Sequence, residues 1–600
     1  MRRDGVDALW RVRPAVDVDE LLELGEVSVK SPRHGLAQRA QGGGAGLGAG
    51  HRRVSILAAM PSQPRARPEA ELLELRVLDG PNRFFVRPAV KLEFEAKSPD
   101  VAESVAAAAG DQVRRLYEGI GLPAPRLTDR TSVDRMRALV AYPWRRRTIS
   151  QAIGSAAARI ALGRSGIRRE LKALRALALG PLASVPSPRI PLVAITGTNG
   201  KSTTTRLIAH IASQAGVVTG MTNSDGIYVR GELVEAGDWT GFGGAGRILS
   251  EPGMRLAVLE TARGGILLRG LGYDHNDVAV VTNVSADHLG LQGIDTLDEL
   301  AEVKATLVRV TRREGWAVLN ADDPRVWRMR QETRAHWYPF TTDAESPAIQ
   351  ASLERGGRAA LLDRGWITIR KPRSKPIRLA RSSELAVTFA GLSRVNVANA
   401  LAAAAACDAI GLEPEQISGG LRSFGRDLDA NPGRLNLFER RGVLVLIDFA
   451  HNEAGLAGLL EVCRALVGRT SRDDGRGRIR LGLGTAGDRT DEMLRNMGEL
   501  AGRGADEVVI AEKRHYLRGR GLEEMNDLFR EGVARGGFDG EVIAYPTELE
   551  TLKALLRRSQ SADIAAVMTH VERAEVFAWL QERGFKPVTV ERVRELVRRP

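Results

Sequence analysis

Apolar runs of strand length alternate with helical patterns from residue 189 to about residue 430. The segments PLVAIT, RLAVLE and DVAVVTNV are short and dominated by β-branched and other apolar side chains. Runs of this kind fill the middle of a parallel sheet that helices cover on both faces. We therefore expect an α/β domain here, with residues 355–390 as a β-rich insertion.

The same alternation returns on a smaller scale after Arg434. The runs GVLVLID, IRLGLG, DEVVIAE and IAAVMT are separated by helical patterns. They predict a second, smaller α/β sheet over residues 433–600, which leaves residues 188–432 for the first α/β domain.

Ahead of these domains the pattern is different. Residues 72–96 are typical of two strands, and Asp79-Gly80-Pro81-Asn82 supplies turn residues between them. Residues 99–120 have helical spacing, and residues 148–183 are helical and basic. Together they predict a small α+β domain over residues 60–187, with a helical basic connector.

The first residues carry no such pattern. QGGGAGLGAG at residues 41–50 is a low-complexity segment, so residues 1–59 are predicted to form a low-complexity or disordered head. A protein that starts near Met60, just beyond that segment, is the alternative.

Charge and cysteine content narrow the functional classes. The formal net charge is 87 − 74 = +13, but the arginines are spread along the chain and no zinc-finger or RNP-type motif occurs. A solvated Arg-rich surface explains this charge better than a nucleic-acid partner does. Cys407 and Cys463 lie in apolar helical patterns, and two cysteines build neither a disulfide scaffold nor a four-cysteine zinc site. Because no apolar run of membrane length and no signal-peptide pattern occurs, we expect a cytoplasmic protein with no membrane partner.

The stretch VAITGTNGKSTTTRLIAHIA at residues 193–212 carries the most specific chemistry. A strand-length run meets a turn between two glycines, followed by lysine, hydroxyl residues and a helical pattern. The strict Walker A spacing fails, because Ile195 stands where a glycine is required. The shorter loop still has backbone N–H groups at a helix N-terminus, Lys201 for the β- and γ-phosphates and the Ser202 hydroxyl for Mg²⁺. A plain tight turn would need the glycines but not Lys-Ser-Thr, so a phosphate site is favoured. Its candidate residues are Gly197, Thr198, Asn199, Gly200, Lys201, Ser202 and Thr203.

Three further polar side chains follow strands of the same predicted sheet. They are Glu260, His288 and Lys304. Each alone is more often structural, but together, near a phosphate loop, they suit magnesium-assisted phosphoryl chemistry. The G-x-G-x-x-G pattern at residues 482–487 is a weaker sign of a dinucleotide site, because the chain has 64 glycines.

Four motifs occur in a fixed order along the chain: TGTNGKST, TNVSADHLG, NADDP and DFAHNEAGL. In this order they resemble the Mur ligase superfamily. Residues 260–304 and 487–521 resemble most closely the C-terminal, Mur-like half of the cyanophycin synthetases, and residues 72–150 faintly resemble the start of those enzymes. Only about 40 residues separate Tyr142 from the Mur-like start, so the ATP-grasp domain found there in cyanophycin synthetases is missing.

The resemblance implies a ligase that uses ATP to phosphorylate a carboxylate, after which an amine displaces phosphate to form an amide. It implies catalytic roles for Lys201, Glu260, His288 and Lys304. Ser202 and Glu260 would ligate one Mg²⁺ and His288 a second. Lys304 matches a lysine that is carbamylated in many family members, and an unmodified Lys304 stays an open alternative.

Other positions carry over to the nucleotide or to the amine. Asn283 and Asn320 match positions near the nucleotide, Arg434 would reach the γ-phosphate on domain closure, and Asp448 would contact the ribose beside His451 and Asn452. Two residues depart from the family pattern, Phe449 in place of Tyr and Glu453 in place of Pro. The candidates for the amine site are Asp488, Arg489, Lys513 and Arg518, with plain surface charges as the alternative.

The predicted fold is therefore α/β, with a central P-loop-type parallel-sheet domain, a C-terminal Rossmann-like domain and a small N-terminal α+β domain. The functional prediction is an ATP- and Mg²⁺-dependent ligase whose partners are a small-molecule or acidic-peptide carboxylate and an amino acid, with arginine as one candidate. The alternative is a non-catalytic or regulatory ATP-binding relative that works with another enzyme. Folylpolyglutamate synthase is a more distant resemblance, and the substrates and oligomeric state, a homo-oligomer included, stay open.

Overall fold

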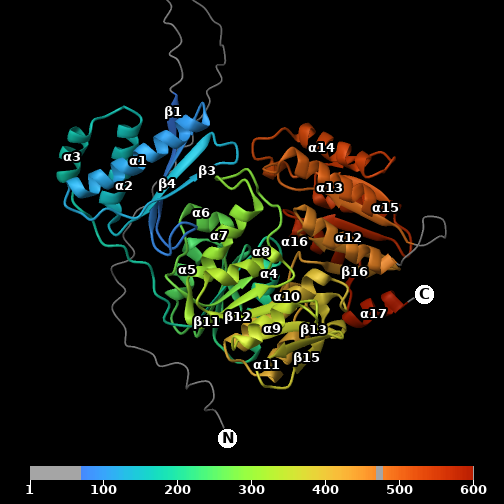
Figure 1. The fold of residues 1–600 in the computed structure, drawn as a ribbon. Coiled ribbons are helices and arrows are strands. Elements are labelled where there is room, and N and C mark those ends of the chain that lie inside the picture. Colours follow the sequence, from blue (N-terminus) through green and yellow to red (C-terminus); the bar gives the residue numbers. More distant parts are fainter. Residues whose placement is uncertain (1–68, 468–476, 599–600) are drawn as a thin grey trace, which may run out of the picture. The chain divides into compact units, whose positions relative to one another are not determined.

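The computed structural model describes residues 69–467 and 477–598, drawn in colour in Figure 1. The predicted head at 1–59, its glycine-rich segment at 41–50 and Met60 lie outside the described residues. Strands of the described part form three sheets, with four, eleven and seven strands. The predicted α/β class, with a small α+β unit ahead of two larger sheets, is confirmed.

The four-stranded sheet is antiparallel and has the order β1-β2-β4-β3. Its strands are β1 (Ala70–Leu78), β2 (Ala89–Ala96), β3 (Thr128–Thr131) and β4 (Arg137–Pro143), and its helices are α1 (Pro99–Gly119), α2 (Arg147–Ala161) and α3 (Ile167–Arg175). The alternation along β2 sends Val90, Leu92 and Phe94 into a core with α1 and α2.

The connection between β1 and β2 is longer than the predicted turn, because it docks on another part of the chain. Asp79 and Gly80 both donate their backbone N–H groups to the carbonyl of Arg269, at 2.7 and 3.1 Å, and the Leu271 N–H donates to the carbonyl of Pro81 at 2.8 Å. A side chain at Gly80 would place its Cβ 1.8 Å from the carbonyl oxygen of Leu271, so only glycine fits this approach.

The eleven-stranded sheet is parallel in its middle and antiparallel at both ends. Its strands are β5 (Leu192–Thr196), β6 (Thr219–Thr222), β7 (Gly226–Val229), β8 (Glu232–Ala236), β9 (Leu256–Glu260), β10 (Asn276–Val281), β11 (Thr311–Asn320), β12 (His336–Thr341), β13 (Ala359–Asp363), β14 (Trp366–Arg370) and β15 (Ile377–Arg381), in the order β15-β14-β13-β12-β11-β10-β5-β9-β6-β7-β8. The β-rich stretch predicted as an insertion contributes β13, β14 and β15 to this sheet, and the three continue it at one edge.

Helices cover both faces of this sheet. They are α4 (Lys201–Gln214), α5 (Phe242–Leu249), α6 (Arg263–Leu268), α7 (Leu297–Arg309), α8 (Pro324–Arg328), α9 (Pro347–Glu354), α10 (Arg394–Ala409) and α11 (Pro414–Ser423). Val193 and Ile195 of β5 pack into the core beneath α4 and α10, whereas Leu192 and Ala194 pack into the opposite core with α7. A strand buried on both faces explains why β5 is an unbroken apolar run in the sequence.

The seven-stranded sheet has the order β20-β19-β18-β21-β17-β16-β22, and its five strands from β20 to β17 are parallel. Its strands are β16 (Asn436–Arg440), β17 (Val443–Asp448), β18 (Ile479–Leu483), β19 (Glu507–Ala511), β20 (Ala544–Tyr545), β21 (Ile564–Met568) and β22 (Lys586–Pro587). Its helices are α12 (Glu453–Val467), α13 (Asp491–Gly504), α14 (Leu522–Arg535), α15 (Glu548–Arg558), α16 (Arg573–Glu582) and α17 (Val590–Arg598), and short 3₁₀ turns occur at Met329–Glu332, Ser382–Glu384, Ala386–Thr388, Leu428–Ala430 and Arg514–Tyr516.

The glycines that imitate a dinucleotide motif have packing roles in this sheet. A Cβ at Gly484 would lie 2.2 Å from the carbonyl oxygen of Ala511, and one at Gly487 would lie 2.1 Å from that of Leu517. Close backbone approach therefore accounts for both glycines without a bound dinucleotide.

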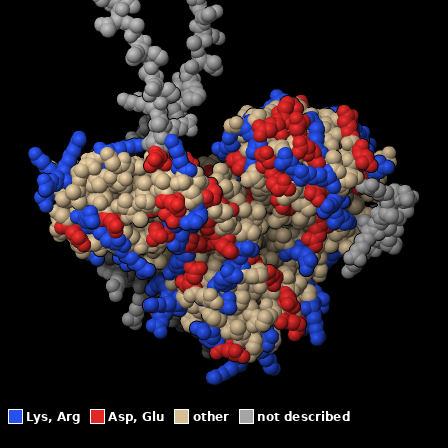
Figure 2. Space-filling view, turned by 45° about the horizontal axis from the view of Figure 1, so that its top comes forward, with Lys and Arg blue, Asp and Glu red and all other residues tan. Residues whose placement is uncertain are grey.

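Two predictions from composition can be compared with the structure. Cys407 and Cys463 are both fully buried in apolar cores, as predicted. Basic and acidic side chains are interspersed over the face shown in Figure 2, which fits a solvated charged surface.

Among the helices of residues 69–467 and 477–598, none has the length and apolar character to span a membrane.

Candidate nucleotide and ligase site

The predicted phosphate loop lies between β5 and α4, at the carboxyl end of the parallel strands. Gly197 and Gly200 have φ angles of 152° and 86°, which favour glycine. A Cβ at Gly197 would lie 1.8 Å from Oγ1 of Thr282, and one at Gly200 would lie 2.2 Å from Oδ1 of Asn399. Both glycines are therefore fixed by backbone conformation and by neighbours far away in the sequence.

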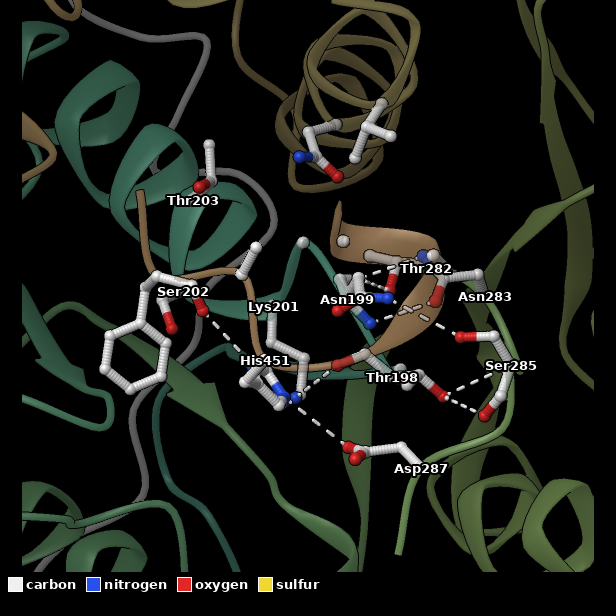
Figure 3. Close-up of a pocket in the computed structure, with 18 of the residues that line it drawn as sticks. Thr198, Asn199, Lys201, Ser202, Thr203, Thr282, Asn283, Ser285, Asp287 and His451 are labelled. Atoms are coloured by element: carbon white, nitrogen blue, oxygen red, sulfur yellow. Dashed lines mark hydrogen bonds and ion pairs between the residues drawn. The ribbon is translucent and has the colours of Figure 1, made fainter. Parts of the chain in front are cut away.

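Lys201 begins α4 and bends back over the loop. Its Nζ donates to the carbonyl of Thr198 at 2.9 Å, so the ammonium lies over the turn (Figure 3). The hydroxyl of Ser202, the next residue, lies 3.3 Å from the hydroxyl of Ser224. This arrangement holds a cation and a hydroxyl beside a helix N-terminus, as a phosphate site with a bound Mg²⁺ requires.

The segment after β10 braces the loop from one side. The backbone N–H of Asn199 donates to Oδ1 of Asn283 at 2.9 Å, and the Asn283 amide returns a bond to the Asn199 carbonyl at 3.0 Å (Figure 3). Thr282 donates to that same carbonyl at 2.6 Å. These bonds fix the loop before any ligand binds, because each pairs a loop backbone group with a residue of a neighbouring strand end.

Glu260 ends β9, the strand beside β5, and is 3% exposed. Its Oε2 is buried with no hydrogen-bond partner among the described residues. Burial raises the pKa of this carboxyl, while the cations Lys201 and Arg434 act in the opposite direction. A buried carboxylate oxygen without a partner, close to Ser202 and Lys201, is chemically suited to a cation.

Lys304 lies on α7 and is also almost fully buried. Its Nζ donates a hydrogen bond to the backbone carbonyl of Gly197 at 2.7 Å, so Lys304 contacts the phosphate loop directly. Burial, followed by repulsion from Lys201, holds the pKa of Lys304 well below its usual range, and Arg263 adds to the repulsion. This position is consistent with the predicted closeness of Lys304 to the phosphate loop.

A second polar cluster lies around Asp287, in the connection after β10. Arg489 reaches it from the seven-stranded sheet, with its Nη2 3.2 Å from Asp287 Oδ1 and its Nη1 2.8 Å from Nδ1 of His288. His451 places its Nε2 3.6 Å from Asp287 Oδ2. The pKa of Asp287 is far below its usual range, because His451, Arg489 and His288 outweigh the opposing effect of burial.

The region of the seven-stranded sheet also supplies residues that reach the phosphate loop near Lys201. Arg434 stacks on the ring of Phe449, 4.2 Å from the centroid, and points Nη2 toward the Ser202 hydroxyl at 3.4 Å. Asp448 accepts the backbone N–H of Leu435 at 2.8 Å. Asn452 exchanges two amide hydrogen bonds with Asn199 of the phosphate loop, each 3.1 Å long. The two sheets therefore meet across the phosphate loop through specific polar contacts.

A cavity of about 1050 Å³ connects these groups. The catalytic, nucleotide and metal residues predicted from the sequence all line it: Gly197, Thr198, Asn199, Gly200, Lys201, Ser202, Thr203, Glu260, Asn283, His288, Lys304, Asn320, Arg434 and Asp448. Residues that are distant in the sequence thus converge on one space large enough for a nucleotide and a second molecule.

The family is decided by the parts of the chain that build this cavity. The model of the Mur ligase middle domain matches residues 195–407, and that of the Mur ligase, glutamate ligase domain matches residues 433–570. The chain contains the Mur ligase middle and C-terminal domains. The cavity lies between them and is lined by both.

Known proteins similar to the chain include several cyanophycin synthetases. The protein from Crocosphaera subtropica is 40% identical over 366 residues, which is 61% of this chain and 41% of that protein. The one from Synechocystis sp. is 41% identical over 368 residues, 61% of this chain and 40% of that protein. A UDP-N-acetylmuramoyl-L-alanyl-D-glutamate--2,6-diaminopimelate ligase from Gloeobacter violaceus is 31% identical over 336 residues, 54% of this chain and 62% of that protein. The chain thus spans about two fifths of the length of the cyanophycin synthetases it matches.

The residues predicted for the amine site do not all lie together. Asp488 and Arg518, from the C-terminal Mur ligase domain, line the cavity. Lys513 instead lies in the interior, where Nζ pairs with Glu548 and donates to the Met568 carbonyl at 2.7 Å. A buried, fully paired lysine has a structural role, so Lys513 is not available to a substrate. Glu453, which stands where the family pattern has proline, begins α12 and accepts a hydrogen bond from the Asn496 amide on α13 at 3.1 Å.

Asp287 and Arg263 are among the cavity residues that were not assigned a role from the sequence. Asp287 is adjacent to His288 in the motif TNVSADHLG, and Arg263 follows Glu260 in the segment ETARGG. Both segments carry the family resemblance, but a carboxylate or guanidinium within a motif gives no sign of which partner it faces. Two of the charged partners of Asp287, His451 and Arg489, come from the C-terminal Mur ligase domain, which no local pattern in the middle domain could reveal.

The residues present fit one magnesium ion beside the phosphate loop, and a second ion at His288 stays a prediction. Ser202 and Glu260 offer a hydroxyl and a buried carboxylate oxygen beside the phosphate loop. His288, predicted to hold a second ion, has its Nδ1 beside the Arg489 guanidinium and 3.3 Å from Asp488 Oδ2. A neighbouring guanidinium opposes a cation at that nitrogen.

Proposed function

We propose that the chain is an ATP-dependent ligase that joins a carboxylate to the amine of an amino acid. A carboxylate oxygen attacks the γ-phosphorus of ATP, ADP leaves, and an acyl phosphate forms. The amine then attacks the acyl carbon, inorganic phosphate leaves with the bonding electron pair, and the nitrogen loses a proton. The sum is acid + amine + ATP → amide + ADP + phosphate + H⁺.

The observation that carries this proposal is the position of Lys201, Glu260 and Lys304 around one cavity between two Mur ligase domains. A phosphate loop alone would support nucleotide binding of any kind. The added buried carboxylate and the second lysine favour phosphoryl transfer, because the transferred phosphoryl group needs cationic and metal contacts on its oxygens.

In this proposal one group of cavity residues binds the nucleotide. The loop from Gly197 to Thr203 and Lys201 hold the phosphates, with Asn283 bracing the loop. Arg434, held flat on Phe449, faces the Ser202 hydroxyl and is placed to neutralise charge on the γ-phosphate. Asp448 and Asn320 complete the nucleotide side of the cavity.

Magnesium would be held by Ser202 and Glu260, and when bound it screens the repulsion between the phosphates and an approaching carboxylate. Lys304 supports the loop through the Gly197 carbonyl in its unmodified form, and carbamylation of this lysine remains a proposal from the family resemblance.

On the amine side, Asp488 and Arg518 face the cavity from the C-terminal domain. A carboxylate and a guanidinium suit the ammonium and the carboxylate of an amino acid. The similarity to cyanophycin synthetases makes arginine a candidate amine and an acidic peptide a candidate acid. Because the chain matches about two fifths of those proteins, we propose only the single ligation step for it.

The test is a screen for ADP and phosphate release with Mg-ATP, acids and amino acids. We expect release only when an acid and an amine are both present. Lys201→Ala should lower the rate at least about 100-fold, because it removes a cation from the transferred phosphoryl group. Arg255→Gln, which removes an exposed arginine outside the cavity, is the matched control and should keep the full rate. Full activity of the Lys201→Ala variant would overturn the proposal.

A further inference from the structure

Arg263 is a cavity residue to which nothing above gives a role. It begins α6, three residues after Glu260, and its side chain is half-buried. It lines the cavity beside Gly264, Leu291 and Gln292. Apart from its chain neighbours and its own helix backbone, an added Cβ at Gly264 would meet no atom within 4 Å, so the cavity is open at the residue that follows Arg263.

The guanidinium of Arg263 has no ion pair within 4 Å among the described residues. Its one hydrogen bond there is a long contact from Nη1 to the Leu291 carbonyl, at 3.5 Å. Burial lowers the pKa of Arg263, and the more distant Asp287 and Asp488 act against that effect. A half-buried guanidinium with five N–H donors is costly to leave without an anion.

The two nearest carboxylates are already paired with other groups. Asp287 lies 3.2 Å from Arg489 and 3.6 Å from His451. Asp488 lies 2.9 Å from Arg489 and 3.3 Å from His288. Either carboxylate would have to break those contacts to pair with Arg263, so among the described residues this guanidinium stays open to an anion that enters the cavity.

Two classes of anion enter this cavity under the proposed function, the nucleotide phosphates and substrate carboxylates. The phosphates belong to the loop from Gly197 to Thr203 and to Lys201. Arg263 lies instead near Asp287, Asp488 and Arg489, which are the charged groups that act on its pKa. It also adds to the positive charge around Lys304. An anion that enters this part of the cavity would meet the Arg263 guanidinium.

We propose that Arg263 binds a carboxylate of the acid substrate and orients that acid beside the nucleotide. This inference rests on the proposed function for the identity of the anion. Guanidinium matches carboxylate in a planar, two-bond geometry, which fixes direction as well as position. The middle domain then holds both the nucleotide and the acid, while Asp488 and Arg518 of the C-terminal domain serve the amine.

The first test is equilibrium binding in the presence of magnesium and a non-hydrolysable ATP analogue. Tri-L-aspartate is the probe, and tri-L-asparagine is its uncharged counterpart. We expect the wild-type protein to bind tri-L-aspartate and not tri-L-asparagine. Arg263→Gln should weaken tri-L-aspartate binding about 10- to 100-fold, the size of a lost charged hydrogen-bond pair. Arg263→Lys should recover part of the loss, since it keeps the charge but not the two-bond geometry.

The controls separate binding from folding and from nucleotide affinity. Arg255→Gln removes an arginine from the same domain outside the cavity and should bind the probe as the wild type does. Affinity for the ATP analogue should be the same in Arg263→Gln and wild type. Unchanged probe binding by Arg263→Gln, no binding of the probe by the wild type, or a loss of nucleotide affinity equal to the loss of probe affinity would each overturn the assignment.

Steady-state kinetics with an active acid–amine pair from the screen give the second test. Arg263→Gln should raise the KM for the acid about 10-fold or more and change the KM for the amine less than about twofold. A rise in the amine KM with an unchanged acid KM would overturn the assignment, because it would place Arg263 in the amine site. If no pair is turned over but probe binding depends on Arg263, the proposed function fails while the anion site stands.

Discussion

The phosphate loop and the cluster around Asp287 are both made of charged and polar groups, but they are assembled differently. The loop is a single run from Gly197 to Thr203, held by the strand end that carries Thr282 and Asn283. The Asp287 cluster combines two residues of the middle domain with His451, Asp488 and Arg489 of the C-terminal domain.

The difference shows which property each part of the site depends on. The residues of the loop and the bonds from Thr282 and Asn283 that hold it all lie within one domain. The Asp287 cluster exists only where the two domains meet, and it therefore depends on their relative position. In the structure the phosphate loop and the Asp287 cluster are both formed, and the hydrogen bonds between Asn199 and Asn452 join the loop to the C-terminal domain.

The largest effect is expected from a substitution in the phosphate loop at Gly197. Gly197→Ala forces a side chain into a φ of 152° and against Thr282, so we expect a loss of about 2–4 kcal/mol of stability and of most nucleotide affinity. Calorimetry of the protein with and without Mg-ATP measures both. Gly237→Ala is the control for φ, because its φ is 130° but an added Cβ there comes no closer than 3.6 Å to its nearest non-adjacent neighbour, Nε1 of Trp239. Equal effects of the two substitutions would contradict the steric explanation.

A smaller effect is expected from removing the Arg489 guanidinium from the cluster around Asp287. Arg489→Met keeps the apolar stem but leaves Asp287 with His451 as its nearest partner, at a cost of about 2–3 kcal/mol. Nucleotide affinity should stay within about threefold of wild type, because the loop is complete without this contact.

A double-mutant cycle with Asp287→Asn sharpens that comparison. The coupling energy between Asp287 and Arg489 should be positive and larger than that of the exposed pair Asp111 and Arg114 on α1, which serves as the control. Coupling no greater than that of the exposed pair would mean that the contact between domains contributes little.

The smallest effect is a pH dependence that belongs to Asp287 alone. Its pKa in the folded protein lies below the unfolded value of about 3.9, so its contribution to stability is complete above that pH and is lost as the pH falls through the folded pKa. The difference in unfolding temperature between wild type and Asp287→Asn should narrow as the pH falls below about 4, because Asp287 then takes up a proton on unfolding. A difference that stays the same from about pH 4 to about pH 2.5 would contradict this explanation.

Much of the fold could be predicted because strand and helix patterns are local. The run from Leu192 to Thr196 is buried on both faces and is apolar throughout, and the glycines and Lys201 follow it directly. The connection after Leu78 could not be predicted as it is, because its turn residues are used to dock on Arg269 and Leu271, which are almost 200 positions away.

The sequence by itself therefore determined the α/β class, the loop between β5 and α4, and the position of Glu260 at a strand end with His288 after the next strand. Those features depend on residue order within short segments or on the common edge of a parallel sheet. Lys304, predicted to follow a strand, lies in the middle of α7 instead. Only the tertiary structure decided that Lys513 is buried against Glu548, that Arg489 pairs with Asp287, and that Arg263 lines the cavity with no ion pair to a residue of the described part of the chain. The physical reason is that the free energy of a charge is set by the solvent and partners around it, and these come from distant parts of the chain.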